Sequence, residues 1–146
     1  MAIDPFMLGS MITRLAHVCL NVRDIQRTIA FYRDALGLPL HFQFTKGGRV
    51  MGAYFRAGRD NFVEAFEKPD VVVQNSGITH FCLETPDIDA AIRSLTAKGV
   101  ACTEKKQGCD RSWQTWLRDP DGNAIELHQY TAQSRQFLGG DVEVDW

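Results

Sequence analysis

The sequence predicts an α+β fold in which a βαβββ module occurs twice, and an internal repeat is the first observation behind this prediction. Residues 17–25 and 80–88 are identical at five of nine positions, and each segment begins with a histidine. A second match has almost the same spacing, because residues 61–64 and 123–126 both begin with asparagine and end with glutamate. Each half therefore opens with a strand that carries a histidine and closes with a strand that carries a glutamate.

Length and composition limit the class of protein. A chain of 146 residues with 45% hydrophobic and 23% charged residues is typical of one globular domain with a sizeable core. The net charge of −2 and the lack of a basic block argue against nucleic acid as a partner. No apolar run approaches the roughly 18 residues of a membrane span. No signal peptide is evident, so we expect a cytoplasmic protein whose four cysteines, which lack CxxC spacing, are reduced thiols.

The first module is expected over residues 12–68, after a leader (1–11) whose composition is typical of a cloning remnant. Asp24 can cap a helix whose apolar residues recur at helical spacing, and Gly37 can end this helix. A pair of glycines after the second strand predicts a hairpin turn. The expected elements are a strand, a helix and three strands, over 13–20, 25–36, 40–45, 49–56 and 61–67.

The second module is expected over residues 78–131 and follows the same plan. Asp87 can cap its helix and Gly99 can end it. The run Asp119-Pro120-Asp121-Gly122 is a strong turn signal before the last strand. The expected elements are again a strand, a helix and three strands, over 78–84, 87–98, 100–105, 112–118 and 123–130. The remaining segments are a linker and a loosely held polar tail, over 69–77 and 132–146.

Side-chain alternation places the candidate metal ligands on one face of the sheet. Residues two apart on a strand share a face, so the repeated histidines and glutamates lie opposite the apolar residues that can pack on the helices. The ligand face should be the concave side of a curved sheet that forms a cup. Two imidazoles and two carboxylates suit a borderline divalent cation such as Zn, Ni, Co, Mn or Fe. We therefore predict one divalent metal ion bound by His17, Glu64, His80 and Glu126.

Other residues near this face complete the predicted site. Cys19 and Cys82 flank the histidines, and we interpret them as small buried spacers rather than metal ligands. His128 lies on the ligand face of the last strand and is either a solvent-exposed residue at the rim or a substrate contact. Trp113 and Trp116 lie on opposite faces of their strand, so one of them can line the pocket. The strands thus supply as substrate-binding candidates Phe62, Phe66, Trp113, Trp116 and His128.

Four longer motifs span about residues 12–131: His17-x-x-Leu-x-Val-x-Asp24, Phe31-Tyr32-x-x-x-Leu-Gly37-Leu38, Gly77-Ile-x-His80 and Asp119-Pro-Asp-Gly-Asn-x-Ile-Glu126-Leu. With them the chain resembles the vicinal oxygen chelate superfamily, which includes glyoxalase I, extradiol dioxygenases, methylmalonyl-CoA epimerase, fosfomycin-resistance enzymes and bleomycin-binding proteins. The resemblance implies a cup-shaped mixed sheet around a metal site. It also implies a homodimer in which the first module of one chain faces the second module of the other, with pairing within one chain as the alternative.

The ligand set is most similar to that of glyoxalase I. Extradiol dioxygenases and fosfomycin-resistance enzymes lack a metal-binding glutamate at the position of Glu64, whereas glyoxalase I has one. The resemblance therefore implies a metal-dependent lyase or isomerase, like lactoylglutathione lyase, that acts on a small carbonyl substrate through an enediolate. A glutamate held loosely by the metal can take and return the proton. Glu64 and Glu126 are the candidates for this catalytic base, and we favour Glu126.

One position departs from the glyoxalase I pattern. Asn21, a further candidate for substrate binding, stands where glyoxalase I has an arginine that contacts a glutathione carboxylate. We therefore expect another thiol carrier or another carbonyl substrate in place of glutathione. Two alternatives from other classes remain open: an extradiol-type dioxygenase that uses Fe(II) or Mn(II), and a resistance protein that binds an antibiotic in the cup.

Overall fold

The computed structural model describes residues 15, 17–72, 78–142 and 144. The expected leader (1–11), most of the expected linker and the first residues of the first expected strand lie outside the described residues. The boundaries of the two modules therefore stay predictions. Within the part of the chain that the structure describes, no helix is long and apolar enough to cross a membrane.

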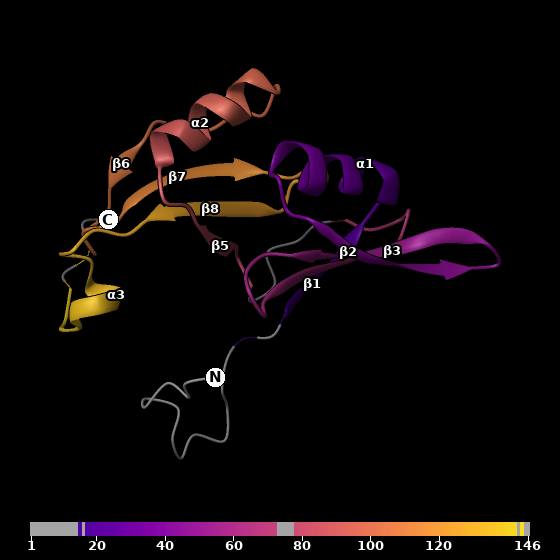
Figure 1. Ribbon diagram of the computed structural model, residues 1–146, viewed down its shortest axis with the longest axis horizontal. Helices are drawn as coiled ribbons and strands as arrows, with labels where there is room; N and C mark the ends of the chain where they lie inside the picture. Colours follow the sequence, from indigo (N-terminus) through magenta and orange to yellow (C-terminus); the bar gives the residue numbers. More distant parts are fainter. Residues whose placement is uncertain (1–14, 16, 73–77, 143, 145–146) are drawn as a thin grey trace, which may run out of the picture.

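The first half of the chain forms a mixed sheet of four strands. These strands are β1 (His17–Val22), β2 (Leu40–Lys46), β3 (Arg49–Arg56) and β4 (Phe62–Glu67), in the spatial order β1-β4-β3-β2. β1 runs parallel to β4, and the other neighbouring strands are antiparallel. In Figure 1 this sheet and its helix make up the indigo-to-magenta half of the molecule.

The second half repeats this arrangement in a second sheet. Its strands are β5 (Phe81–Glu84), β6 (Lys106–Gln107), β7 (Trp113–Arg118) and β8 (Ala124–Gln129), in the order β5-β8-β7-β6. β5 runs parallel to β8, and β7 is antiparallel to both of its neighbours. The equal topology of the two sheets confirms the predicted α+β fold of two βαβββ modules. In each sheet the first strand, β1 or β5, lies at an edge.

One helical segment covers each sheet, and Figure 1 shows both on the same side of the molecule. In the first half, α1 (Ile25–Ile29) continues as a wider helical turn, η2 (Ala30–Ala35). In the second half, α2 (Ile88–Ala97) has the equivalent place. Neither of these two segments packs on the opposite faces, which carry the predicted ligands. On that side of the second sheet lies the short helix α3 (Arg135–Leu138), whose Phe137 packs against Tyr130 at 5.2 Å between ring centroids.

The helices begin and end where the sequence predicts. The Asp24 carboxylate accepts hydrogen bonds from two N–H groups in the first turn of α1, and Asp87 accepts one in the first turn of α2. Both helical segments are followed by a glycine with positive φ, 74° at Gly37 and 80° at Gly99. Glycine adopts this conformation without the steric cost that a side chain would bring, so it ends a helix readily.

A single hydrophobic core joins the two halves. Side chains from both sheets and both helical segments belong to one buried cluster. Polar contacts add to it: the Tyr32 hydroxyl donates to Asp119 Oδ2 (3.0 Å), and the Arg23 N–H donates to Asp121 Oδ1 (2.8 Å). Burial and the neighbouring Asp119 carboxylate raise the pKa of Tyr32 well above its ordinary value. The turn before β8 is thus anchored on the helix of the first module.

One expected strand is largely missing. The sequence predicts a strand over 100–105, but the structure has only the two-residue β6 beyond it. The side-chain Oγ1 of Thr103 accepts the hydrogen bond of the Trp116 N–H (2.9 Å), while the Thr103 N–H donates to the Trp116 carbonyl (2.9 Å). A side-chain oxygen therefore replaces a backbone carbonyl, and this interrupts the regular ladder.

The tail is held more firmly than expected. It contains a short helix, α3 (Arg135–Leu138), which follows the fully buried Ser134. The Ser134 hydroxyl accepts hydrogen bonds from the Thr131 N–H (2.8 Å) and the Ser112 hydroxyl (3.0 Å). These contacts fix the start of the tail on the second sheet.

Candidate metal centre

The first pair of predicted ligands lies on the face of the first sheet that points away from α1. Nε2 of His17 on β1 lies 3.5 Å from Oε2 of Glu64 on β4. The His17 side chain is 42% exposed and that of Glu64 only 15%, so the carboxylate lies deeper. The Tyr54 hydroxyl lies 3.1 Å from Nδ1 of His17. A proton on Nδ1 that is donated to this hydroxyl leaves the Nε2 lone pair free for a metal ion.

The second pair repeats this geometry on the second sheet. Nε2 of His80, which directly precedes β5, lies 3.5 Å from Oε2 of Glu126 on β8. Nδ1 of His80 lies 2.9 Å from the Thr79 hydroxyl. The indole of Trp116 packs edge-on against the imidazole, with 4.7 Å between ring centroids. Each half thus holds one His–Glu pair in which Nε2 faces the carboxylate and Nδ1 faces a hydroxyl.

The two pairs do not converge within one chain. Among the residues that the structure describes, one group of three or more potential ligands has donor atoms within 4.8 Å of one another, and it consists of Cys82, Glu126 and His128. This group includes one of the four predicted ligands. A site made of all four would need the modules to be placed against each other differently than in a single chain.

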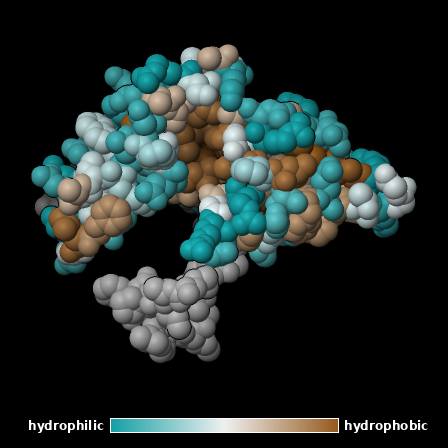
Figure 2. Space-filling model, in the orientation of Figure 1, coloured by the Kyte–Doolittle hydropathy of each residue, from teal (hydrophilic) through white to brown (hydrophobic). Residues whose placement is uncertain are grey.

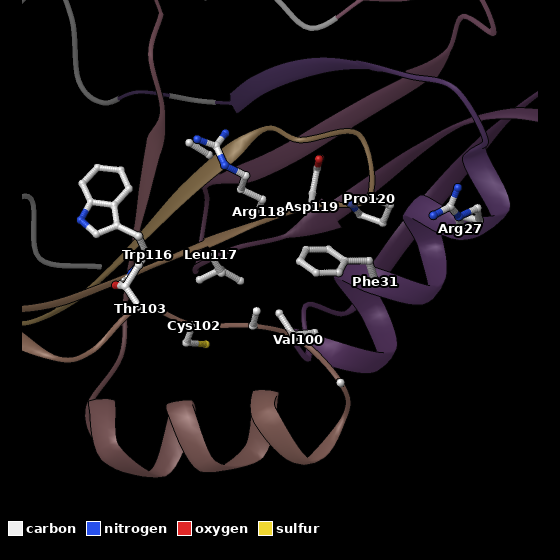
Figure 3. Close-up of a pocket in the computed structure, with 13 residues that line it drawn as sticks. Arg27, Phe31, Val100, Cys102, Thr103, Trp116, Leu117, Arg118, Asp119 and Pro120 are labelled. Atoms are coloured by element: carbon white, nitrogen blue, oxygen red, sulfur yellow. Dashed lines mark hydrogen bonds between the residues drawn. The ribbon is translucent and has the colours of Figure 1, made fainter.

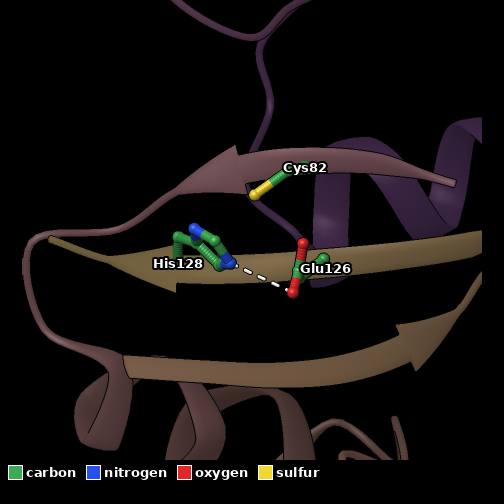
Figure 4. A group of neighbouring side chains, drawn as sticks. All are labelled: Cys82, Glu126 and His128. Carbon is green, nitrogen blue, oxygen red and sulfur yellow. Dashed lines mark ion pairs between the residues drawn. The ribbon is translucent and has the colours of Figure 1, made fainter. Parts of the chain in front are cut away.

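Cys82 and His128 extend the second pair (Figure 4). Cys82 lies opposite Glu126 in the register of β5 and β8, and Nε2 of His128 lies 3.0 Å from Glu126 Oε1. The neighbouring Cys82 sulfur and Glu126 carboxylate raise the pKa of His128 to about 10. His128 is only 8% exposed, so its interpretation as a solvent-exposed residue at the rim is wrong.

Cys19 and Cys82 are exposed, which corrects the prediction that they are buried spacers. The reason is the uncovered ligand face: both cysteines alternate with residues that pack against the core and so point away from the helices. Desolvation of the sulfur by the surrounding protein is the larger cause, and the Glu64 carboxylate the smaller, that raises the pKa of the Cys19 thiol to about 11. The alternation with His80 was the signal that placed Cys82 on the ligand face, whereas its place beside Glu126 depends on the register of β5 and β8.

Aromatic side chains cover much of the ligand face of the first sheet. Phe62 lies 4.9 Å from Tyr54, and Phe66 lies 4.7 Å from Phe44, measured between ring centroids. Phe42 stacks on Tyr54 at 4.6 Å and is 43% exposed. The structure therefore places Phe62 and Phe66, both predicted to bind substrate, in an apolar surface next to the first His–Glu pair.

The other predicted substrate-binding residues are divided between two faces. Trp116 lies opposite Glu126 in the sheet, on the ligand face. Trp113 lies on the other face, where Nζ of Lys105 is 4.9 Å from its ring centroid. Asn21 lines a cavity of about 400 Å³ together with His80, between β1 and the segment before β5. Asn21 and Trp116 thus adjoin the second pair, and Trp113 does not.

A larger cavity of about 660 Å³ lies between α1 and the second module (Figure 3). Phe31, Val100 and Leu117 line it together with the charged side chains of Arg27 and Arg118. Figure 2 shows a hydrophobic hollow between the two halves of the molecule. None of the four predicted metal ligands lines this cavity. Its lining comes from several separate segments, so no local pattern in the sequence could have predicted it.

The fold and the repeated His–Glu pairs agree with a match between most of the chain and one protein family. Residues 14–127 match the family model described as the Glyoxalase/Bleomycin resistance protein/Dioxygenase superfamily. The chain belongs to this superfamily. The resemblance that the four sequence motifs indicated is thereby confirmed. The superfamily contains metal-dependent enzymes, including lactoylglutathione lyase, and also proteins with other activities.

Several similar proteins show this range. The chain is 28% identical over 120 residues to "Glutathione transferase FosA" of Serratia marcescens, with 81% of this chain and 82% of that protein covered. It is 23% identical over 168 residues to "Glyoxalase I" of Saccharomyces cerevisiae, which covers 95% of this chain but 50% of the yeast protein. The solved structure of TnmS3, an antibiotic binding protein from Streptomyces sp. CB03234, has the same fold, with a TM-score of 0.69, 22% identity and coverage of 84% of this chain and 100% of that chain.

The ligands that this member of the superfamily presents fit a divalent ion. In both pairs a largely buried carboxylate faces an imidazole nitrogen at 3.5 Å, and in both the other imidazole nitrogen has a hydroxyl partner. Nitrogen and oxygen donors of this kind suit Zn, Ni, Co, Mn and Fe. A hydroxyl contact on the second nitrogen is the arrangement that orients a metal-binding histidine.

Proposed function

We propose that this protein is a divalent-metal-dependent lyase or isomerase of the glyoxalase I type. Its substrate would be a small molecule with two adjacent oxygens, one of them a carbonyl. The observation that supports this most strongly is the repeated His–Glu pair, with 3.5 Å between Nε2 and Oε2 in both halves. Glu64 is important here, because it adds a second carboxylate to a set that would otherwise be two histidines and one glutamate.

The complete site would form in a homodimer. Each cup would combine His17 and Glu64 of one chain with the His80–Glu126 pair of the second copy. Three features support this: the pairs lie on separate sheets in one chain, neither α1 nor α2 covers their ligand faces, and β1 and β5 are edge strands whose free backbone groups can meet another chain. Dimers are also common in this superfamily.

The proposed reaction moves one proton between adjacent carbons, while the hydroxyl proton passes from one of the two substrate oxygens to the other. A bound divalent ion would supply Lewis-acid stabilisation of negative charge on the substrate oxygens. A glutamate carboxylate takes the proton from the carbon next to the carbonyl and returns it to the adjacent carbon, so no external redox partner is needed. We favour Glu126 as this base, with Glu64 as the alternative. His128, 3.0 Å from Glu126 Oε1, can hold that carboxylate in one orientation while Oε2 faces the substrate side.

The residues around the pairs favour an apolar carrier rather than glutathione. Asn21 brings no positive charge to the position where an arginine would contact a glutathione carboxylate. The exposed ring of Phe42 and the half-buried ring of Phe62 offer stacking surface instead. We therefore expect hemithioacetals of methylglyoxal with an apolar or aromatic thiol to react faster than the glutathione adduct.

The test is a complementation experiment with His17→Ala and His80→Ala. Each variant alone should lose turnover, because every cup lacks one histidine. In a mixed dimer, one of the two cups has all four ligands, so refolding the variants together should restore about a quarter of the parent's turnover. Recovery would support assembly across the dimer. Full turnover by both single variants would contradict the four-ligand site.

A second candidate function is the binding of a planar drug without turnover. The aromatic surface of the first sheet favours it, and an antibiotic binding protein has the same fold. An extradiol-type dioxygenase is the other alternative, and it would require Fe(II) or Mn(II). Metal analysis combined with a hemithioacetal assay separates the three. Tight binding of a planar compound by a protein that shows no turnover with any thiol adduct would favour the drug-binding function.

A further inference from the structure

We propose that Cys82, Glu126 and His128 bind a thiophilic divalent ion such as Zn(II) at a site contained within one chain. This site differs from the four-ligand cup, because it uses neither His17 nor Glu64 and does not need a second copy. It shares only Glu126 with that cup. The proposal therefore does not depend on the proposed enzymatic activity.

The backbone brings the three donors together. Cys82 and Glu126 are direct neighbours on the parallel strands β5 and β8, and His128 is two residues further along β8 on the same face. All three donor atoms lie within 4.8 Å of one another. Ligands of one zinc ion are separated by somewhat less than this, so rotamer adjustments would close the site. Figure 4 shows the Cys82 sulfur pointing toward the two side chains on β8.

His128 supplies an independent reason to expect a ligand. His128 is only 8% exposed, and neither of its ring nitrogens makes a hydrogen bond to the described residues. Nε2 has only the ion-pair contact to Glu126 Oε1 at 3.0 Å. Buried polar atoms are nearly always paired, so this imidazole needs a partner, and a cation between it, the thiol and the carboxylate would provide one.

The donor chemistry selects the class of metal. A thiolate combined with an imidazole and a carboxylate suits Zn(II) and its spectroscopic substitute Co(II), and it is unsuited to Mg(II) or Ca(II). Binding would release the thiol proton of Cys82 and the proton on the donor nitrogen of His128, since the thiolate and the neutral imidazole are the metal-binding forms. Cys82 is exposed, so the ion has access and one coordination position can stay open to water.

The first module provides a matched control. Cys19 and Glu64 occupy the places of Cys82 and Glu126, but Phe66 stands where the second module has His128. The first module therefore has a similar thiol and carboxylate on its ligand face without the third donor. A metal that binds through a generic exposed cysteine would use Cys19 as readily as Cys82.

The experiment is a titration of the full-length protein, stripped with a chelator, with Co(II). One equivalent per chain should produce the near-ultraviolet absorption of a thiolate–cobalt bond. The band should disappear in Cys82→Ser and persist in Cys19→Ser and in His17→Ala. His128→Gln should also lose it, and circular dichroism establishes that this variant with a changed buried residue is folded. Cys82→Ser alters an exposed atom only, so it decides the question if His128→Gln does not fold.

Several results would overturn this proposal. They are a parent without the band, a band that survives in Cys82→Ser, or one that disappears equally in Cys19→Ser. A parent that turns over its substrate but shows no thiolate band would remove this site and leave the proposed enzyme intact. A thiolate band in a protein without turnover would support this site and count against the proposed enzymatic activity.

Discussion

The two ligand faces share one backbone frame and differ in their chemistry. In both modules a histidine, the first residue of β1 or the residue directly before β5, faces a glutamate on the last strand at 3.5 Å, with a cysteine two residues after the histidine. Two residues after the glutamate, on the same face of the last strand, the first module has Phe66 and the second has His128. As a result the second module gathers three donors within 4.8 Å, whereas the first presents an aromatic surface beside its pair.

This difference shows what the repeat determines and what it leaves free. Strand register fixes the His–Glu pair, because it depends on hydrogen bonds between backbones and is the same in both sheets. The side chain two residues beyond the glutamate does not affect the register, so it can change without loss of the fold. One module can therefore bind apolar groups while the other adds metal ligands.

The largest expected effect concerns the two glutamates. Glu126→Gln keeps the size and one coordinating oxygen but cannot accept a proton, so we expect it to lower turnover by about 10²–10⁴-fold. Glu64→Gln should lower turnover much less if the two glutamates are unequal as proposed. Steady-state rates with methylglyoxal adducts of several thiols, at equal metal content, measure both. A larger loss in Glu64→Gln would assign the base to the first module.

The next effect tests the aromatic surface of the first module. A Cβ atom at Gly52 would lie 2.7 Å from Phe66 Cδ1 and 2.9 Å from Phe44 Cδ2. We therefore expect Gly52→Ala to lower the free energy of unfolding by about 1–3 kcal/mol, because the rings must shift. Gly58→Ala is the control, since its nearest contact would be 3.4 Å. Equal stability of the two variants in denaturant titrations would show that the rings yield freely.

Much of this frame can be predicted from the sequence. The aspartate caps, the terminal glycines and the alternation on the strands are local signals, and the structure has all of them where expected. The contact of His128 with Cys82 could not be predicted in the same way, because it depends on which residues of β5 and β8 are paired. The strand expected over 100–105 was wrong for a similar reason. The regular strand does not form because the Thr103 hydroxyl, rather than a backbone carbonyl, accepts the hydrogen bond of the Trp116 N–H. This competition arises only when β7 lies beside the segment.

A smaller effect concerns the contact between the modules. Tyr32 donates a hydrogen bond to Asp119, whereas the equivalent helix position of the second module is the apolar Leu95. Tyr32→Phe should lower the free energy of unfolding by about 1–2 kcal/mol, because Asp119 keeps its other partners around the turn. Leu95→Ile, a change of similar size without a polar group, is the matched control.

The same hydrogen bond predicts a pH dependence. The pKa of Tyr32 is raised in the folded state, so the folded protein binds more protons than the unfolded chain once the pH exceeds about 10, the ordinary value for tyrosine. Stability should therefore fall as the pH rises above about 10, and the fall should be shallower in Tyr32→Phe. Thermal unfolding midpoints of both proteins between pH 8 and about 11 measure this difference. Parallel curves would show that Tyr32 does not titrate on unfolding.

The smallest expected effect is a gain rather than a loss. Phe66→His places an imidazole two residues beyond Glu64, where the second module has His128, and Cys19 already lies on the same face. If that one side chain makes the difference between the modules, the variant should bind a second equivalent of Co(II), with about twice the thiolate–cobalt absorbance of the parent. Phe66→Asn, which is polar but a poor ligand for cobalt, should stay at the parent's value. The extra absorbance should disappear when Cys19→Ser is added to Phe66→His, and should survive the addition of Cys82→Ser. A variant that folds normally yet gains no absorbance would show that the ligand faces of the two modules differ in more than this position.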